Sequence, residues 1–79
     1  MIIDIRSNSK YMIGHIENAL NIEYYDLLLN YKKYLSKNQT YYIYCDSGVR
    51  SKIVVSKLNN LGYNCVNIDG GYSNYLLNR

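Results

Sequence analysis

Short apolar runs alternate along the chain with longer segments in which apolar residues recur every three or four positions. Four of the apolar runs predict β-strands, and they cover residues 1–6, 19–22, 41–45 and 64–68. The run at 41–45 shows no alternation of polar and apolar residues, which is typical of a parallel strand buried on both faces. This run is therefore expected at the centre of a sheet.

Two segments have the periodicity of amphipathic helices. The apolar stripe of the helix expected at residues 23–35 is made of Tyr24, Leu27, Leu28, Tyr31, Tyr34 and Leu35. The stripe of the helix expected at residues 51–61 is made of Val54, Val55, Leu58 and Leu61. Gly62 is placed to end this second helix in a left-handed conformation. Shorter helices are expected between the first two strands and at residues 72–78.

The alternation of strands and helices predicts crossover units and therefore a parallel sheet. We expect one α/β domain over residues 1–79, with a small open parallel sheet of about four strands and helices on both faces. Apolar residues make up 48% of the chain, a composition that favours a folded globule over a disordered chain.

Charge and hydropathy exclude several classes of partner. The net charge is only +3, and no basic tract is interleaved with aromatic residues in the manner of a nucleic-acid-binding surface. No apolar run approaches the roughly 18 residues that a membrane span requires. Residues 1–6 lack the basic start of a signal peptide. A cytoplasmic protein without nucleic-acid or membrane partners is therefore expected.

The two cysteines, Cys45 and Cys65, are too few for a disulfide framework. Cys45 ends one predicted strand and Cys65 begins the next, so in parallel neighbours they lie about 10 Å apart along the strand direction. A disulfide requires Cα atoms within roughly 7 Å of each other. Two free thiols are expected, with Cys65 in the core.

Chemically active residues follow the predicted strands. In open α/β sheets, sites form outside the carboxyl ends of the strands. Cys45 lies at such an end, Arg6 follows the first strand, and Gly70 and Gly71 follow the last. We expect these segments to converge on one crevice.

The loop after Cys45 favours a thiolate. Gly48 allows a tight curl that turns successive N–H groups inward, ahead of a helix N-terminus with partial positive charge. Arg50 adds a full positive charge. Together these features are expected to lower the pKa of Cys45 and make it a nucleophile without a neighbouring base. Asp46 would oppose this effect, so it is expected to point to solvent.

Four motifs resemble those of rhodanese-like domains. "CDSGVRS" (residues 45–51) resembles their active-site loop C-x-x-G-x-R-S, and "IIDIR" (residues 2–6) their strand ending in Asp-x-Arg. "GHIENALNI" (residues 14–22) is similar to their Gly-His-Ile stretch. "NIDGGYSNY" (residues 67–75) is similar to their closing Gly-Gly-x-x-x-Trp, with tyrosine in place of tryptophan. The motifs occur in the family's order over nearly the whole chain.

The resemblance implies a sulfurtransferase in which Cys45 takes sulfur from thiosulfate or another persulfide and holds it as a persulfide. A thiol, cyanide or a protein cysteine would accept the sulfur, and no cofactor is implied. The implied substrate-binding residues are those of the loop, namely Asp46, Ser47, Gly48, Val49, Arg50 and Ser51. Four further residues are candidates for the pocket or its scaffold: Asp4, Arg6, Gly70 and Gly71.

The chain also departs from the family. Many members carry an extra strand and helix ahead of the segment that matches residues 1–6, so a sheet lacking that strand and helix is expected. One edge of this sheet would be exposed or covered by another subunit. Asp46 stands where many thiosulfate-using members carry a basic residue, which argues against thiosulfate as the physiological donor.

Two alternative functions stay open. A phosphatase loop of the related dual-specificity group has five residues between Cys and Arg, whereas four separate Cys45 from Arg50, which favours a single-sulfur site. A non-catalytic binding module of the same fold is the second alternative, against which the presence of Cys45, Gly48 and Arg50 speaks.

Three other residues have structural interpretations. His15, the only histidine, is expected to be a hydrogen-bonded turn residue, because a thiolate needs no base. Asp4 and Arg6 are expected to form an ion pair at the end of the first strand. One histidine and two distant cysteines lack zinc spacing, so no metal site is expected.

Overall fold

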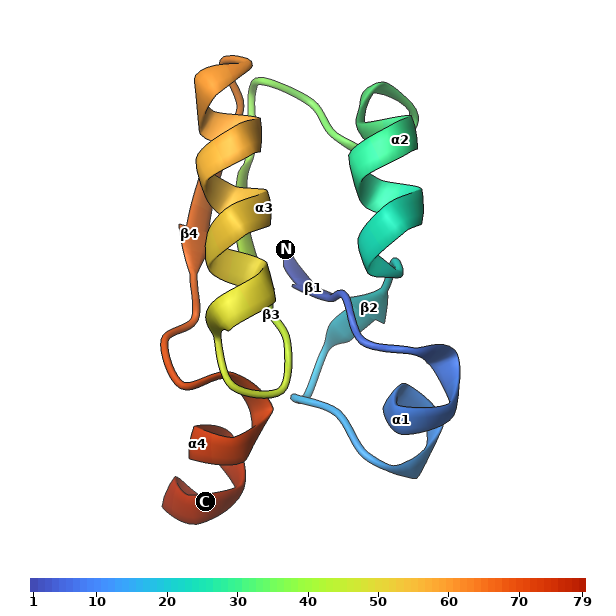
Figure 1. The fold of residues 1–79 in the computed structure, drawn as a ribbon, viewed down its shortest axis with the longest axis vertical. Helices are drawn as coiled ribbons and strands as arrows, with labels where there is room; N and C mark the ends of the chain where they lie inside the picture. The colour runs from blue at the N-terminus through green and yellow to red at the C-terminus, as the bar shows by residue number, and fades with distance from the viewer.

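Four parallel strands form one sheet in the computed structural model, which describes residues 1–79 (Figure 1). The strands are β1 (Ile2–Asp4), β2 (Ala19–Asn21), β3 (Thr40–Tyr44) and β4 (Asn64–Asn67), arranged in the order β2-β1-β3-β4. The helices between and after them are α1 (Asn8–Ile13), α2 (Tyr24–Tyr34), α3 (Val49–Asn60) and α4 (Gly71–Asn78). The predicted α/β architecture and its parallel sheet are confirmed.

The main core lies between one face of the sheet and helices α2 and α3. Ile3 and Ile43 are paired neighbours on this face and are both fully buried. Leu27 of α2 and Leu58 of α3 pack against them in the same cluster. The apolar stripes of α2 and α3 therefore pack into the core, as their periodicity predicts. Leu61 is an exception and remains 46% exposed just beyond the end of α3.

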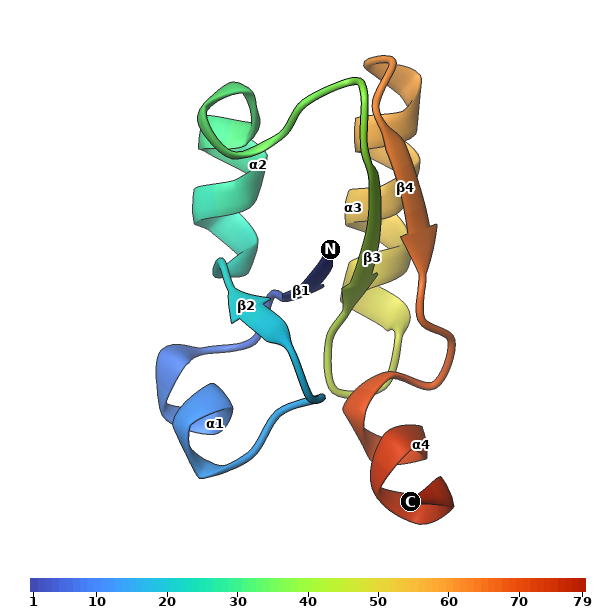
Figure 2. The same cartoon turned by 180° about the vertical axis from the view of Figure 1, so that it is seen from behind.

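Helices α1 and α4 lie toward the carboxyl ends of the strands (Figure 2). They contribute to a second cluster around Tyr44, Ile16 and Ala19 on the other face of the sheet. Tyr42 and Val66, which are paired on this face nearer its amino end, are 44% and 45% exposed. The prediction that the strand at 41–45 is buried on both faces is thus wrong at Tyr42, because α1 and α4 reach only the carboxyl part of that face.

The ends of the elements differ from the predicted ends by one or two residues. Helix α3 begins at Val49 rather than Ser51, because Gly48 adopts a left-handed conformation (φ +95°) directly before it and serves as its N-cap. Gly62 is also left-handed (φ +95°), as predicted. The N–H of Tyr63 then reaches back to the carbonyl of Leu58 at 3.1 Å. None of the helices is long and apolar enough to cross a membrane.

Candidate active site

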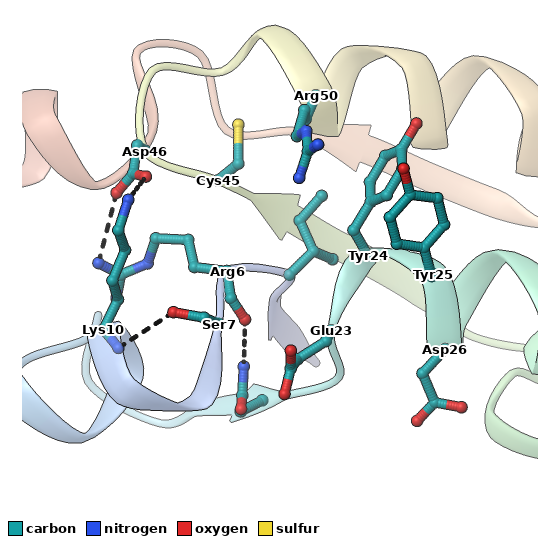
Figure 3. A pocket seen from close by; sticks show the side chains of 12 residues that line it. Arg6, Ser7, Lys10, Glu23, Tyr24, Tyr25, Asp26, Cys45, Asp46 and Arg50 are labelled. Carbon is teal, nitrogen blue, oxygen red and sulfur yellow. Dashed lines mark hydrogen bonds and ion pairs between the residues drawn. The ribbon is translucent and has the colours of Figure 1, made fainter.

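A cavity of about 710 Å³ opens at the carboxyl edge of the sheet, where Cys45 follows β3 and Arg6 follows β1 (Figure 3). Its walls come from the ends of β1 and β2, helices α1 and α2, and the loop into α3. Of the residues singled out in the sequence, the cavity is lined by Arg6, Cys45, Asp46 and Arg50. The predicted convergence is confirmed for the segments that hold Arg6 and Cys45, but it is wrong for Gly70 and Gly71, which do not line this cavity.

The Cys45 sulfur is held inside the turn that leads into α3. Figure 3 shows it directed into the loop rather than toward the far wall of the cavity. The N–H of Gly48 donates to the sulfur at 3.2 Å and the N–H of Ser51 at 3.4 Å, and the Ser51 hydroxyl oxygen also lies 3.4 Å away. The left-handed Gly48 makes this curl possible, since a side chain there would be strained and would press on the backbone nitrogen of Gly70.

Burial of the Cys45 thiol raises its pKa, but four hydrogen bonds to the sulfur outweigh this effect. In the thiolate these bonds come from the Ser51 hydroxyl and from the N–H groups of Ser51, Gly48 and Arg50. The pKa of Cys45 is therefore held below the ordinary value of a cysteine thiol. The site favours a thiolate, as the loop sequence predicted.

Arg50 contributes to the site through its backbone and its side chain. Its backbone N–H is among the groups that lower the pKa of Cys45. The guanidinium carbon lies 4.7 Å from the centre of the Tyr24 ring, in a cation–π contact across the cavity. The Arg50 side chain is exposed and forms no ion pair, so it remains free to meet a ligand.

The start of helix α4 holds the loop after Cys45 in place through backbone hydrogen bonds. The N–H of Tyr72 donates to the carbonyl of Cys45 at 2.9 Å, and the N–H of Ser73 to the carbonyl of Asp46 at 3.0 Å. These bonds give both loop carbonyls a hydrogen-bond partner at the N-terminus of α4. Gly71 (φ +56°) passes so close to both carbonyls that a side chain there would collide with them. Gly70 and Gly71 are thus scaffold for the cysteine loop.

Asp4, Arg6 and Tyr44 form a buried polar cluster beside the site. The Arg6 guanidinium donates to the Asp4 carboxylate at 2.7, 3.0 and 3.1 Å, and Tyr44 donates its hydroxyl to the same carboxylate at 2.6 Å. Arg6 also donates to the carbonyl of Gly14 at 2.7 Å, which ties the end of β1 to the segment before β2. Burial raises the pKa of Tyr44, so this hydroxyl keeps its proton and remains a donor. The predicted Asp4–Arg6 ion pair is confirmed.

Asp46 does not simply point to solvent, contrary to the prediction. Its half-exposed carboxylate pairs with Lys10 at 2.6 Å and lies 3.6 Å from a guanidinium nitrogen of Arg6 (Figure 3). The reason is that α1 brings Lys10 to the rim of the cavity, where a nearby cation attracts the carboxylate. Asp46 therefore compensates two cations of the site.

The remaining loop residues lie outside this cavity. Ser47, Gly48 and Val49 border a separate hollow of about 740 Å³ beside α3, together with Gly70. The Val49 side chain is 66% exposed, so its contribution to the loop around Cys45 comes from the backbone. Ser51 is fully buried beneath the sulfur.

Sequence reasoning missed several residues of the site. Lys10 lies on a helix whose position was not predictable from the motifs, and Tyr24 was assigned only to the apolar stripe of α2. Asn67 ends β4 and accepts a hydrogen bond from the Ser51 hydroxyl at 2.5 Å. Its place at the carboxyl end of a strand was the one signal that could have singled it out.

The contacts of His15 and Cys65 are those of structural residues. The His15 ring stacks on Tyr11 with ring centres 3.8 Å apart, and its Nδ1 lies 2.8 Å from the Tyr11 carbonyl oxygen. Cys65 is buried in the main core, and both cysteines are free thiols, as predicted. No group of three or more His, Cys, Asp or Glu side chains is placed to hold a metal ion.

At neutral pH, Cys45 is expected to react with iodoacetamide much faster than Cys65. Burial raises the pKa of Cys65 to about 11, whereas the loop holds the pKa of Cys45 below the ordinary value. The alkylation rate at Cys45 should rise with pH and level off with a midpoint below the ~8.5 of a free cysteine. Peptide mass mapping separates the two sites, and a Cys45 midpoint above that of free cysteine would contradict the hydrogen-bonded thiolate.

This chain is similar to several known proteins in sequence and in fold. A rhodanese-related protein from Thermoplasma volcanium superposes with a TM-score of 0.89 at 30% identity, over 98% of this chain and 76% of the other. A tRNA sulfurtransferase from Thermoplasma acidophilum is 39% identical over 62 residues, and a tRNA uridine(34) hydroxylase from Wigglesworthia glossinidia brevipalpis is 31% identical over 83 residues.

These two curated relatives are much longer proteins. The aligned part covers 78% of this chain but 12% of the sulfurtransferase, and 96% of this chain but 26% of the hydroxylase. The model of the rhodanese-like domain matches residues 1–78, which is nearly the whole chain. This chain therefore belongs to the rhodanese-like domain family.

Proposed function

We propose that this chain is a sulfurtransferase that carries sulfane sulfur as a persulfide on Cys45. The observation that carries the proposal is the pair of backbone N–H groups directed at the Cys45 sulfur from Gly48 and Ser51. Preorganised donors of this kind stabilise a sulfur anion without a general base. Membership of the rhodanese-like family and the name of the Thermoplasma acidophilum relative support the same chemistry.

The proposed reaction has two displacements. The Cys45 thiolate attacks the outer sulfur of a donor, a new S–S bond forms, and the donor's own S–S bond breaks with release of a thiolate or, from thiosulfate, sulfite. The loop N–H groups and the nearby Arg50 then support the negative charge of the persulfide. An acceptor thiol or cyanide attacks the outer sulfur, and Cys45 leaves as the thiolate that began the cycle.

The charges around the cavity favour an organic persulfide over thiosulfate as donor. Arg6 is paired with Asp4 and lies near Asp46, and Lys10 is paired with Asp46, so their charges are already compensated. Arg50 is the cavity's one arginine or lysine without an ion pair. Thiosulfate brings two negative charges at its reacting group to one free cation, whereas the reacting group of an organic persulfide brings only one.

Turnover with two donors tests the proposed function. The protein is given thiosulfate or glutathione persulfide, with cyanide or a dithiol as acceptor, and thiocyanate or sulfide is measured. We expect transfer from both donors, with a higher kcat/KM for the persulfide. The proposal would fail if neither donor supported transfer, and hydrolysis of an aryl phosphate in their place would identify a phosphatase.

A further inference from the structure

A hydrogen-bonded chain runs from the Cys45 sulfur away from the cavity and into the end of β4. The Ser51 hydroxyl oxygen lies 3.4 Å from the sulfur and 2.5 Å from Oδ1 of Asn67. Ser51 is fully buried, and Asn67 is half-buried. The hydroxyl therefore has two neighbours that can accept its single proton, the sulfur and the amide oxygen.

The orientation of the Asn67 amide is fixed by its other contacts. Its Nδ2 lies 2.9 Å from Oδ1 of Asp69 and 3.4 Å from the carbonyl oxygen of Gly48. A carboxylate and a carbonyl only accept hydrogen bonds, so the amide NH₂ group must face them. The amide oxygen is thereby directed at Ser51, where it acts as an acceptor.

Only one arrangement of protons satisfies this chain when Cys45 is a thiol. The thiol donates to the Ser51 oxygen, and the Ser51 hydroxyl donates to Asn67. When Cys45 is a thiolate, the sulfur is the stronger acceptor, but the Ser51 hydroxyl can donate its proton to the sulfur only if it stops donating to Asn67. The Asn67 amide oxygen then loses its hydrogen bond from Ser51, which is 2.5 Å long. This loss opposes ionisation of Cys45.

We propose that Asn67 is a positioning residue that competes with the Cys45 sulfur for the Ser51 hydroxyl proton, and so limits how strongly this hydroxyl stabilises the thiolate. The consequence is a balance between the two steps of the cycle. A less stabilised thiolate is a stronger nucleophile toward the donor but a poorer leaving group when the acceptor takes the sulfur. The significance of this balance rests on the proposed sulfur-transfer function, although the competition itself does not.

The charged and ionisable groups around the Cys45 sulfur lie mainly on its cavity side, away from Ser51 and Asn67. Those lining the cavity are Arg6, Lys10, Glu23, Tyr24, Tyr25, Asp26, Asp46 and Arg50. Asp69 is the charged group that contacts Asn67. Asn67→Ala leaves the groups that line the cavity in place but removes the hydrogen bond to Asp69. An effect of Asp69 on Cys45 would persist without the Ser51 hydroxyl, so the double variant separates it from the effect of the hydroxyl proton.

The test is the pH dependence of Cys45 alkylation by iodoacetamide in the variants Asn67→Ala, Ser51→Ala and the double variant. Asn67→Ala is expected to lower the Cys45 midpoint by roughly 0.5 to 1 pH unit, because the hydroxyl is released to the sulfur. Ser51→Ala should raise the midpoint. In the Ser51→Ala background, the additional Asn67→Ala change should have no effect, since no shared proton remains.

Asn64→Ala is the matched control, because Asn64 is an exposed asparagine at the opposite end of β4. Thermal unfolding establishes that each variant is folded at the assay temperature, and Asn67→Ser replaces Asn67→Ala if the alanine variant is not. An unchanged or raised midpoint in the folded Asn67 variant would overturn the proposal. Equal shifts with and without Ser51 would also overturn it, because they would indicate a general effect on the loop.

Alkylation does not require sulfur transfer, so this experiment is independent of the turnover assay. A protein that showed the expected shifts but no turnover would keep the proton competition and lose the proposed function. A protein that turned over normally but showed no shift in Asn67→Ala would keep the function and lose the role of Asn67.

Discussion

Replacing Cys45 with serine is expected to lower sulfur transfer by at least about 10³-fold, to the background rate, while the fold is retained. A serine hydroxyl is not ionised by the N–H groups that stabilise a thiolate, and it cannot form a persulfide. The change is small in volume, and the loop carbonyl contacts from Tyr72 and Ser73 involve only the backbone. Stability should therefore change little.

Cys65→Ala is the matched control for this experiment. Cys65 belongs to strand β4, is buried in the main core and has no part in the cavity. Its replacement removes a buried sulfur and should reduce stability, but sulfur transfer per folded molecule should remain near the wild-type rate. Transfer that persisted in Cys45→Ser and was lost in Cys65→Ala would reverse the assignment of the nucleophile.

Replacing Asp4 with alanine is expected to reduce the free energy of unfolding by about 3–5 kcal/mol. Asp4 is fully buried and is the main partner of Arg6, whose side chain is only 5% exposed. Without the carboxylate, Arg6 becomes a buried charge with no full counter-ion, and Tyr44 loses the acceptor for its hydroxyl. A domain of 79 residues has a total stability of roughly 4–12 kcal/mol, so this loss is large.

Urea unfolding followed by circular dichroism measures this loss. Glu17→Ala removes an exposed carboxylate and should leave the midpoint nearly unchanged. Should Asp4→Ala prove unfolded, as a protein of low stability would be, Tyr44→Phe tests the same cluster at a cost of about 1 kcal/mol. A loss below about 1 kcal/mol in a folded Asp4→Ala variant would contradict a structural role for the buried ion pair.

The parts of this fold that the sequence predicts are those set by local signals. The stripes of α2 and α3 follow from apolar spacing, and the cysteine loop follows from Gly48 and the start of a helix within a few residues. The Asp4–Arg6 pair was predictable because its members are two positions apart at a strand end. Because sites form at the carboxyl ends of parallel strands, the sequence also predicted that the segments of Arg6 and Cys45 lie close together.

The parts that escaped prediction depend on contacts between distant segments. The hydroxyl of Tyr44 reaches Asp4 across 40 positions of the chain. The pairing of Asp46 with Lys10 spans 36 positions and depends on how α1 packs. The exposure of Tyr42 follows from how far α1 and α4 extend over the sheet, which no local pattern encodes.

The most direct test of the proposed function is the intact mass of the protein after exposure to glutathione persulfide and removal of excess donor. We expect a gain of one sulfur atom, located on Cys45 by peptide mapping with a thiol-blocking probe and released when cyanide is added. Cys65 should gain none. Sulfur absent from Cys45, or bound there and not released to any acceptor, would contradict the assignment of this cysteine as the persulfide carrier.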